Sequence, residues 1–241
     1  MVTSYGLPMA TSSGLLDHVR QADPDRFFCS LFAPSNLRER LWLLYAFNHE
    51  LARAREVASE PTLALIRLTW WREVVEGIHK PHEIATPLHE ALEAGWFART
   101  DLARLIDARE MEAEPGIPDF DAFMTYARGT AGLLARISGK VLGVDDTAIE
   151  DLGTAYGISG ILRAAPFLAR TGRNLLPQDG TSQEKIITAA RALLKTKPPK
   201  TALAATLPAV FARRDLGKPH RPHGLPDRLA VLLAALTGRI P

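Results

Sequence analysis

The chain has 241 residues, of which 46% are hydrophobic, so it is long enough to bury a large core without covalent cross-links. It has a single cysteine, Cys29, which excludes an internal disulfide and a multi-cysteine metal site. The net charge is only +2, but residues 191–241 hold ten Lys or Arg and two Asp or Glu, a net charge of +8, whereas residues 1–190 have a net charge of −6.

These features set expectations about location and partners. Residues 1–14 are polar and uncharged, which indicates a flexible N-terminus rather than a secretory signal. Because no apolar run of about 18 residues occurs, we expect no transmembrane helix. The basic C-terminal segment predicts attraction to an anionic membrane surface, so we expect a cytoplasmic protein that is peripheral on the inner face of the cytoplasmic membrane. No nucleic-acid-binding module is visible, and we expect no nucleic acid partner.

The element pattern is helical throughout. Frequent Ala, Leu, Arg and Glu, and the lack of alternating β-branched runs, predict a single all-α domain over residues 1–241. The expected helices cover about 34–58, 62–77, 87–94, 99–112, 120–142, a helix capped by Asp145 or Asp146 that runs to Arg170, then 182–196, 200–216 and 226–236. Asp119 is an expected N-cap, and Pro166 is expected to bend or restart its helix, because an interior proline costs about 3 kcal/mol.

Three stretches together resemble one known family. Residues 25–76 read DRFFCSLFAPSNLRERLWLLYAFNHELARAREVASEPTLALIRLTWWREVVE, residues 126–132 read YARGTAG, and residues 153–177 read GTAYGISGILRAAPFLARTGRNLLP. Their order and spacing resemble the squalene/phytoene synthase superfamily over about residues 15–240. The resemblance implies an isoprenoid-synthase-type helical bundle around a central cavity. In active members, two Asp-rich motifs face each other across that cavity and hold the Mg²⁺ ions that bind two prenyl diphosphates.

This chain departs from the family at those metal-binding positions. The first motif falls on Ala52, Arg53 and Glu56, and the second falls on Ala164 and Leu168. Only Glu56 keeps a carboxylate, so the positions cannot assemble a cluster of hard cations. Metal stabilisation of a leaving group contributes several kcal/mol, and each 1.36 kcal/mol is about tenfold in rate. We therefore expect ordinary prenyl coupling to be slower by many orders of magnitude, and we assign no catalytic residue.

Some polar side chains remain candidates for binding a ligand. They are Tyr45, Asn48, Glu56, Arg163 and Arg173. The two arginines match retained family positions and either hold an anionic head group or form salt bridges between helices. Tyr45 either lines the cavity or packs in the core. Glu56 is either a residual ligand, a salt-bridge partner of a neighbouring arginine, or a solvent-facing side chain.

Other conspicuous residues receive structural interpretations. Two His-x-x-His pairs, which begin at His79 and at His220, lie beside prolines and lack an obvious third ligand, so we expect no metal site. Cys29 follows two phenylalanines and is expected to be a buried packing residue. Trp70 and Trp71 are adjacent, so one is expected in the core and the other is a candidate partner anchor.

A narrower resemblance concerns function. The phrases AFNHELARARE, SEPTLALIRLTWW and ILRAAPF resemble a divergent branch of the superfamily that includes the mitochondrial assembly factor for respiratory complex I. This resemblance implies a non-catalytic assembly or accessory factor, with complex I subunits or assembly intermediates as partners and no cofactor. The alternatives are an active prenyltransferase of the squalene/phytoene synthase type that uses Mg²⁺, and an isoprenoid- or lipid-binding protein that kept the cavity.

Overall fold

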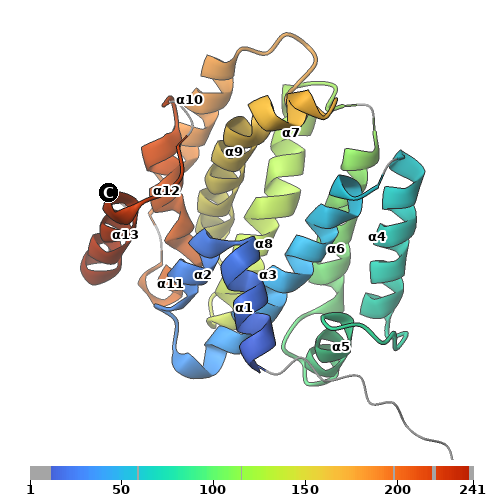
Figure 1. Cartoon of the computed structure of the whole chain (residues 1–241). Coiled ribbons are helices and arrows are strands. Elements are labelled where there is room, and N and C mark those ends of the chain that lie inside the picture. Colours follow the sequence, from blue (N-terminus) through green and yellow to red (C-terminus); the bar gives the residue numbers. More distant parts are fainter. Residues whose placement is uncertain (1–11, 59, 115, 198, 219–220, 239–241) are drawn as a thin grey trace, which may run out of the picture.

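A computed structural model describes residues 12–58, 60–114, 116–197, 199–218 and 221–238, and this part of the chain is all-α (Figure 1). The α-helices are α1 (Ser12–Ala22), α2 (Pro24–Ser30), α3 (Ser35–Glu56), α4 (Pro61–Glu76), α5 (Ala85–Glu93), α6 (Arg99–Glu110), α7 (Phe120–Ala127), α8 (Leu133–Val141), α9 (Thr147–Arg170), α10 (Gln183–Leu193), α11 (Leu203–Thr206), α12 (Pro208–Asp215) and α13 (Leu225–Thr237). Two 3₁₀ segments, η1 (Met111–Ala113) and η3 (Lys200–Ala202), and one π turn, η2 (Arg128–Gly132), complete the described elements. The all-α prediction is confirmed.

The N-terminal region adds two helices that the sequence pattern did not predict. Helix α1 begins at Ser12, inside the stretch expected to be flexible, and residues 1–11 of that stretch lie outside the described residues. Helix α2 follows at once, with Asp23 as its N-cap: the Asp23 side chain accepts a hydrogen bond from the backbone N–H of Arg26. These short helices depend on burial against α3 rather than on propensity, because isolated helices shorter than about 12–15 residues are marginal in water.

The expected helix over residues 120–142 is interrupted by a π turn. Helix α7 passes into η2, which contains Thr130, and then into α8. π turns inside α-helices occur frequently at functional sites. Asp146 is the N-cap of α9, and this helix continues through Pro166 to Arg170, so it does not restart there, which was one of the two expected outcomes. Pro166 is exposed and lies in the last turns of α9, where water can bond the carbonyl that the missing N–H leaves free.

The C-terminal third is more divided than predicted. The expected helix over residues 200–216 is split into η3, α11 and α12, because Pro208 starts a new helix where its missing N–H needs no partner. Helix α13 forms close to its expected position. None of the described helices combines the length and apolar character needed to cross a bilayer.

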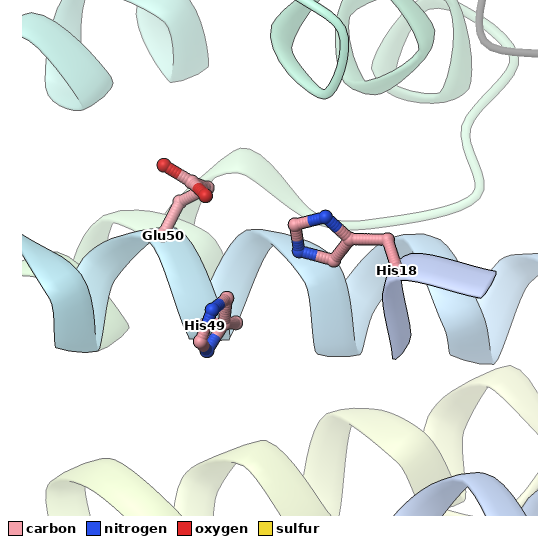
Figure 2. A group of neighbouring side chains, drawn as sticks. All are labelled: His18, His49 and Glu50. Atoms are coloured by element: carbon pink, nitrogen blue, oxygen red, sulfur yellow. The ribbon is translucent and has the colours of Figure 1, made fainter. Parts of the chain in front are cut away.

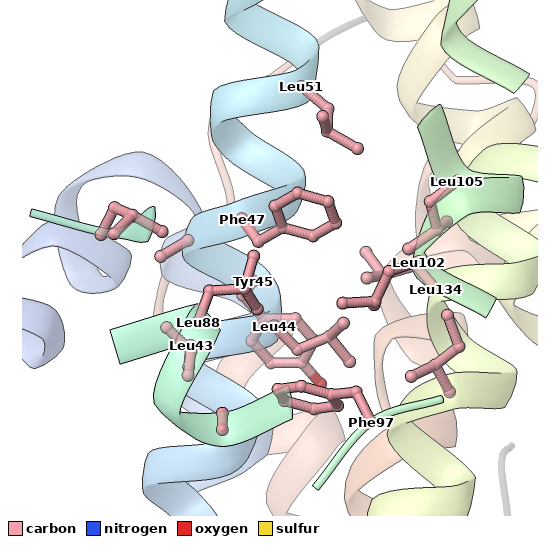
Figure 3. Packing of buried hydrophobic residues seen from close by; sticks show 14 of the residues in the cluster. Leu43, Leu44, Tyr45, Phe47, Leu51, Leu88, Phe97, Leu102, Leu105 and Leu134 are labelled. Atoms are coloured by element: carbon pink, nitrogen blue, oxygen red, sulfur yellow. The ribbon is translucent and has the colours of Figure 1, made fainter. Parts of the chain in front are cut away.

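The hydrophobic core has two main clusters, one around α3 and one around α9. One cluster joins α3 to α4, α5, α6 and α8, and Figure 3 shows Phe47 and Leu102 within it. A second cluster joins α9 to α2, α7, α10, α12 and α13, and it includes Cys29, which is fully buried as expected. Burial also raises the pKa of the Cys29 thiol, which keeps it protonated.

Small residues let α9 approach the π turn closely. A Cβ atom added at Gly153 would lie 2.3 Å from Ala135 Cβ, and one added at Gly157 would lie 2.4 Å from Ala131 Cβ. Both separations are far below van der Waals contact, so only glycine fits at these positions. This close packing fixes the side of α9 that carries the second motif position, Ala164.

Candidate functional site: an arginine-rich central cavity

Helices α3 and α9 lie on two sides of a cavity of about 400 Å³, to which η2 also contributes. Ala52 and Glu56 line it from α3, and Ala164 and Leu168 line it from α9. The structure therefore brings the two degenerate motifs to one cavity, as the resemblance implied. Three of these four side chains are apolar, and the fourth, Glu56, is exposed.

The other first-motif position, Arg53, lies outside this cavity. Its guanidinium is 3.0 Å from the Glu50 carboxylate, and the side chain lines a separate groove between α3 and α4. Arg53 follows Ala52 by one residue, and neighbouring positions on a helix point in different directions. Because of this separation, Arg53 does not pair with Glu56.

Of the predicted ligand-binding residues, Asn48, Glu56, Arg163 and Arg173 line the cavity, whereas Tyr45 does not. Tyr45 is buried in the core, and burial raises the pKa of its phenol to about 12. The structure therefore agrees with the core-packing alternative for Tyr45 and not with the cavity-lining alternative.

The cavity has a polar floor. The Arg26 guanidinium lies over the Tyr156 ring, 4.7 Å from its centroid, a cation–π arrangement. Both side chains line the central cavity on one side and, on the other, a small void next to Tyr45. Arg26 is also 2.6 Å from Asp23, and this partner raises its pKa although burial alone would lower it. The pair separates the cavity from the deeper core.

A buried carboxylate, Glu112, organises one wall. Its Oε1 accepts hydrogen bonds from Arg109 Nη1 at 2.6 Å and from the Tyr126 hydroxyl at 2.7 Å, and its Oε2 accepts one from Arg173 Nη2 at 3.1 Å. Arg109 also donates to Asn48 Oδ1 at 3.2 Å. Burial opposes the charge on Arg109, but Tyr126 and Glu112 raise its pKa. Arg173 therefore forms the salt bridge that was one of its two expected roles.

A second buried ionic cluster joins α2, α9 and α12. His223 Nδ1 is 2.7 Å from Asp25 Oδ2, and His223 Nε2 is 2.9 Å from Asp215 Oδ2. Hydrogen bonds to Asp215 and Asp25 raise the pKa of His223 to about 9, which favours the imidazolium form at neutral pH, although Arg163 Nη1 lies 3.0 Å from His223 Nε2. Arg163 donates to Asp215 Oδ2 at 3.2 Å, so it too forms a salt bridge between helices.

The donor set of the cavity does not fit a magnesium cluster. The charged side chains that line the cavity are Arg26, Arg109, Arg163 and Arg173, together with Asp23, Asp25, Glu56 and Glu112. Mg²⁺ requires oxygen ligands in near-ideal octahedral geometry. Here Asp23 and Glu112 already accept hydrogen bonds from arginines, and Asp25 is hydrogen-bonded to His223. Glu56 is the remaining carboxylate, and one carboxylate is too few for such a cluster. The guanidinium groups of Arg26, Arg109 and Arg173 thus neutralise two of the four carboxylates.

Three further polar side chains, His18, His49 and Glu50, lie close together beside the bundle (Figure 2). One potential ligand atom from each lies within 4.8 Å of the others. His49 and Glu50 leave α3 on different sides, and Glu50 is already paired with Arg53. We therefore base no metal-dependent function on this group.

One histidine of each His-x-x-His pair, His82 and His223, forms hydrogen bonds that stabilise the fold. His82 Nδ1 accepts hydrogen bonds from the backbone N–H groups of Ile84 and Ala85, which satisfies donors at the start of α5. His223 belongs to the ionic cluster, and His220 lies outside the described residues.

The two adjacent tryptophans divide as expected. Trp71 is buried, whereas Trp70 is half-buried and lines the α3–α4 groove. That groove has a volume of about 380 Å³ and includes Val57, Ile66 and Arg67.

Sequence reasoning missed most of the cavity's charged residues. Asp25 and Arg26 open the first stretch that carries the resemblance, and Tyr126 opens the second, so their positions were visible as a signal. Glu112 and His223 gave no such signal, because one partner of each, Arg173 and Asp25 respectively, lies more than 50 residues away.

Comparisons with known proteins agree with this architecture. A family model described as squalene/phytoene synthase matches residues 19–214. The Alicyclobacillus acidocaldarius squalene synthase HpnC has a TM-score of 0.68 at 17% identity, over 85% of this chain and 91% of that one. A dehydrosqualene synthase in complex with ligand has a TM-score of 0.73 at 12% identity, over 94% and 95%. At these identities the structures establish a shared fold.

Curated relatives carry the name "NADH dehydrogenase (ubiquinone) complex I, assembly factor 6". The Bos taurus protein is 30% identical over 205 residues, 76% of this chain and 62% of the relative. The Mus musculus protein is 32% identical over 186 residues, 71% and 56% respectively. The chain thus spans roughly three fifths of the length of the relatives it matches. The expected likeness to this divergent branch is confirmed, and because the family model covers most of the sequence, the chain belongs to the squalene/phytoene synthase family.

Proposed function

We propose that this protein is a non-catalytic family member that acts as an assembly factor for a complex I-type NADH:quinone oxidoreductase, at the inner face of the cytoplasmic membrane. The observation that carries the proposal is the state of the central cavity. Its motif positions are apolar at Ala52, Ala164 and Leu168, and its buried carboxylates are engaged by arginines or by His223.

This arrangement opposes coupling of prenyl diphosphates. Gathering several Mg²⁺ ions requires carboxylates that are free to coordinate them. Releasing Glu112 for that purpose leaves two partly buried guanidinium groups, those of Arg109 and Arg173, without their carboxylate, and breaking a buried ion pair costs about 3–5 kcal/mol. The cavity is therefore stabilised in a form without metal ions, and we propose that no cofactor is needed.

The partner side of the proposal rests on two observations. The relatives are named for assembly of complex I, and two of the three sequence phrases that resemble their branch fall largely on α3 and α4. On the molecule, α4 and α3 form a groove in which Ile66 is exposed and Trp70 is half-buried. Arg67 lines this groove, and so does Arg53, which is paired with Glu50. We assign this groove to a segment of a complex I subunit or assembly intermediate that carries apolar side chains flanked by acids, because such a segment complements both the surface and its charge.

Deletion of the gene from its host tests the proposal. We expect loss of membrane NADH:quinone reductase activity and of assembled enzyme on native gels, with both restored by the wild-type gene. The variant Ile66→Glu should fail to restore them. Ala164→Ser, a small change inside the cavity, is the matched control and should restore them. Unchanged reductase content in the deletion strain would show that the protein has another role.

The two alternatives are separable in vitro. Incubation of the purified protein with farnesyl or geranylgeranyl diphosphate and Mg²⁺ should give no coupled product above background, and a Mg²⁺-dependent product would establish the prenyltransferase alternative. Native mass spectrometry of protein purified from its host should show no isoprenoid or lipid retained in the cavity. A stoichiometric bound lipid would favour the binding-protein alternative.

A further inference from the structure

Helix α13 carries an apolar face that nothing in the described chain covers. The leucines of this helix are 39–76% exposed. They are Leu225, Leu229, Leu232, Leu233 and Leu236. The spacing of four, three, one and three residues places them in one stripe about 100° wide, the pattern of an amphipathic helix that buries one side.

The opposite face of α13 is firmly attached to the domain, so the stripe is a fixed surface. Val231 and Ala234 are buried against the core that contains α12. Asp227 is fully buried, accepts from the backbone N–H of Gly224 at 2.9 Å, and pairs with Arg214 and with Arg221, each at 2.6 Å. The leucines therefore point outward because the helix is anchored by its other side.

Basic residues adjoin the stripe in the sequence. Lys218, Arg221 and Arg228 are exposed next to it in the sequence, and Arg228 follows the buried Asp227 at the margin of the leucine stripe. The whole segment 191–241 carries a net charge of +8. Helix α13 lies at the edge of the bundle opposite α4, so the stripe and the α3–α4 groove face different surroundings (Figure 1).

We infer that the leucine face of α13 docks flat on an anionic lipid surface. A helix with leucines on one side and basic residues around it lies in the interface of a bilayer, with its apolar side among the acyl chains and its cations at the headgroups. Its 13 residues are too few to span the hydrocarbon layer, which needs about 20.

Other occupants fit the surface less well. Two copies of this chain related by a two-fold axis would bring two strongly basic segments together, and such juxtaposition of like charges is unfavourable. A protein partner usually contacts aromatic and arginine anchors in pockets, whereas leucine is under-represented among such anchors. The stripe has five leucines, no aromatic residue and no cavity among those described.

Vesicle binding by the purified chain tests this inference without any complex I component, so its failure is distinguishable from failure of the proposed assembly role. In co-sedimentation, we expect binding to vesicles that contain 30% phosphatidylglycerol and at least tenfold weaker binding to pure phosphatidylcholine vesicles. The double variant Leu229→Asp/Leu233→Asp should lower binding at least tenfold. Lys218→Gln/Arg228→Gln should weaken binding severalfold and reduce its sensitivity to salt.

A matched control comes from the opposite edge of the bundle. Leu63 and Leu65 are similarly exposed on α4, and Leu63→Asp/Leu65→Asp should bind anionic vesicles like the wild type. Circular dichroism and thermal unfolding confirm that each variant is folded. Absence of binding by the folded wild type, equal binding by the α13 double variant, or equal binding to neutral vesicles would each overturn the inference. So would light scattering that showed a dimer dependent on Leu229 and Leu233.

Discussion

The ionic cluster around His223 makes stability depend on pH in a defined direction. His223 lies between Asp25 and Asp215, stacks on Phe211 with ring centroids 4.5 Å apart, and has a pKa of about 9. In the unfolded chain its pKa returns to about 6.5. Because the folded value is the higher one, the stabilisation is complete below pH 6.5 and is lost as the pH rises towards 9.

The magnitude follows from the shift. A difference of about 2.5 pKa units corresponds to an upper limit of about 3 kcal/mol at 1.36 kcal/mol per unit. Solvent reaches the partly exposed carboxylates and Arg163, which screens the interaction, so we expect about 1–2 kcal/mol. For a chain of this length, that amounts to a change of roughly 2–8 °C in melting temperature.

Urea or thermal unfolding of the wild type and of His223→Gln at pH 6.0, 7.5 and 9.5 measures this effect. The difference in free energy of unfolding between the two proteins should be largest at pH 6.0 and should shrink by about 1–2 kcal/mol at pH 9.5. His79→Gln, which changes an exposed histidine, is the control and should show no such trend. A wild-type-to-variant difference that stays constant with pH would refute the assignment of an imidazolium between two carboxylates.

Three further predictions concern the cavity wall, the packing of α9 and the cap of α13. Glu112→Gln should lower the free energy of unfolding in urea by about 3–5 kcal/mol, because it leaves the partly buried guanidinium groups of Arg109 and Arg173 without a carboxylate. A change below about 1 kcal/mol would contradict the role given to Glu112. Gly153→Ala should destabilise the protein by about 1–3 kcal/mol through overpacking. Gly160→Ala in the same helix, where an added Cβ meets nothing within 4 Å, should stabilise the protein by up to about 1 kcal/mol. Equal effects of the two variants in thermal unfolding would refute the close-packing argument. Asp227→Asn should weaken the protection of α13 amides in hydrogen exchange relative to those of α3, because it removes the charged partner of two arginines; unchanged protection would show that Val231 and Ala234 alone anchor the helix.

Much of the fold was readable from local pattern. The bounds of α3, α4, α6 and α9 lie within a few residues of those predicted, because each has an apolar stripe and punctuation by proline, glycine or a capping aspartate such as Asp146. Helices α1 and α2 and the π turn were not predicted. Their conformations depend on packing against α3 and α9, which no short window of sequence contains.

The same division applies to the cavity. The sequence showed by itself that the two motifs lack all but one of their acids, Glu56, since the identity of Ala52 or Ala164 needs no coordinates. The sequence did not decide whether Arg163 and Arg173 bind an anion or form salt bridges, because the guanidinium group serves equally in both roles. The structure favours the salt bridges by placing Asp215 and Glu112 within hydrogen-bonding distance of these arginines.

The amino-acid sequence alone determined an all-α chain, a buried cysteine and a basic C-terminal segment, because these follow from composition and from helical periodicity. Only the tertiary structure decided that the leucines of α13 face outward while Val231 faces inward, since a helical stripe does not say which side meets the core. It also decided which carboxylate each buried arginine meets. Such pairs depend on distances between residues far apart in the chain, and these distances exist only after the helices have packed.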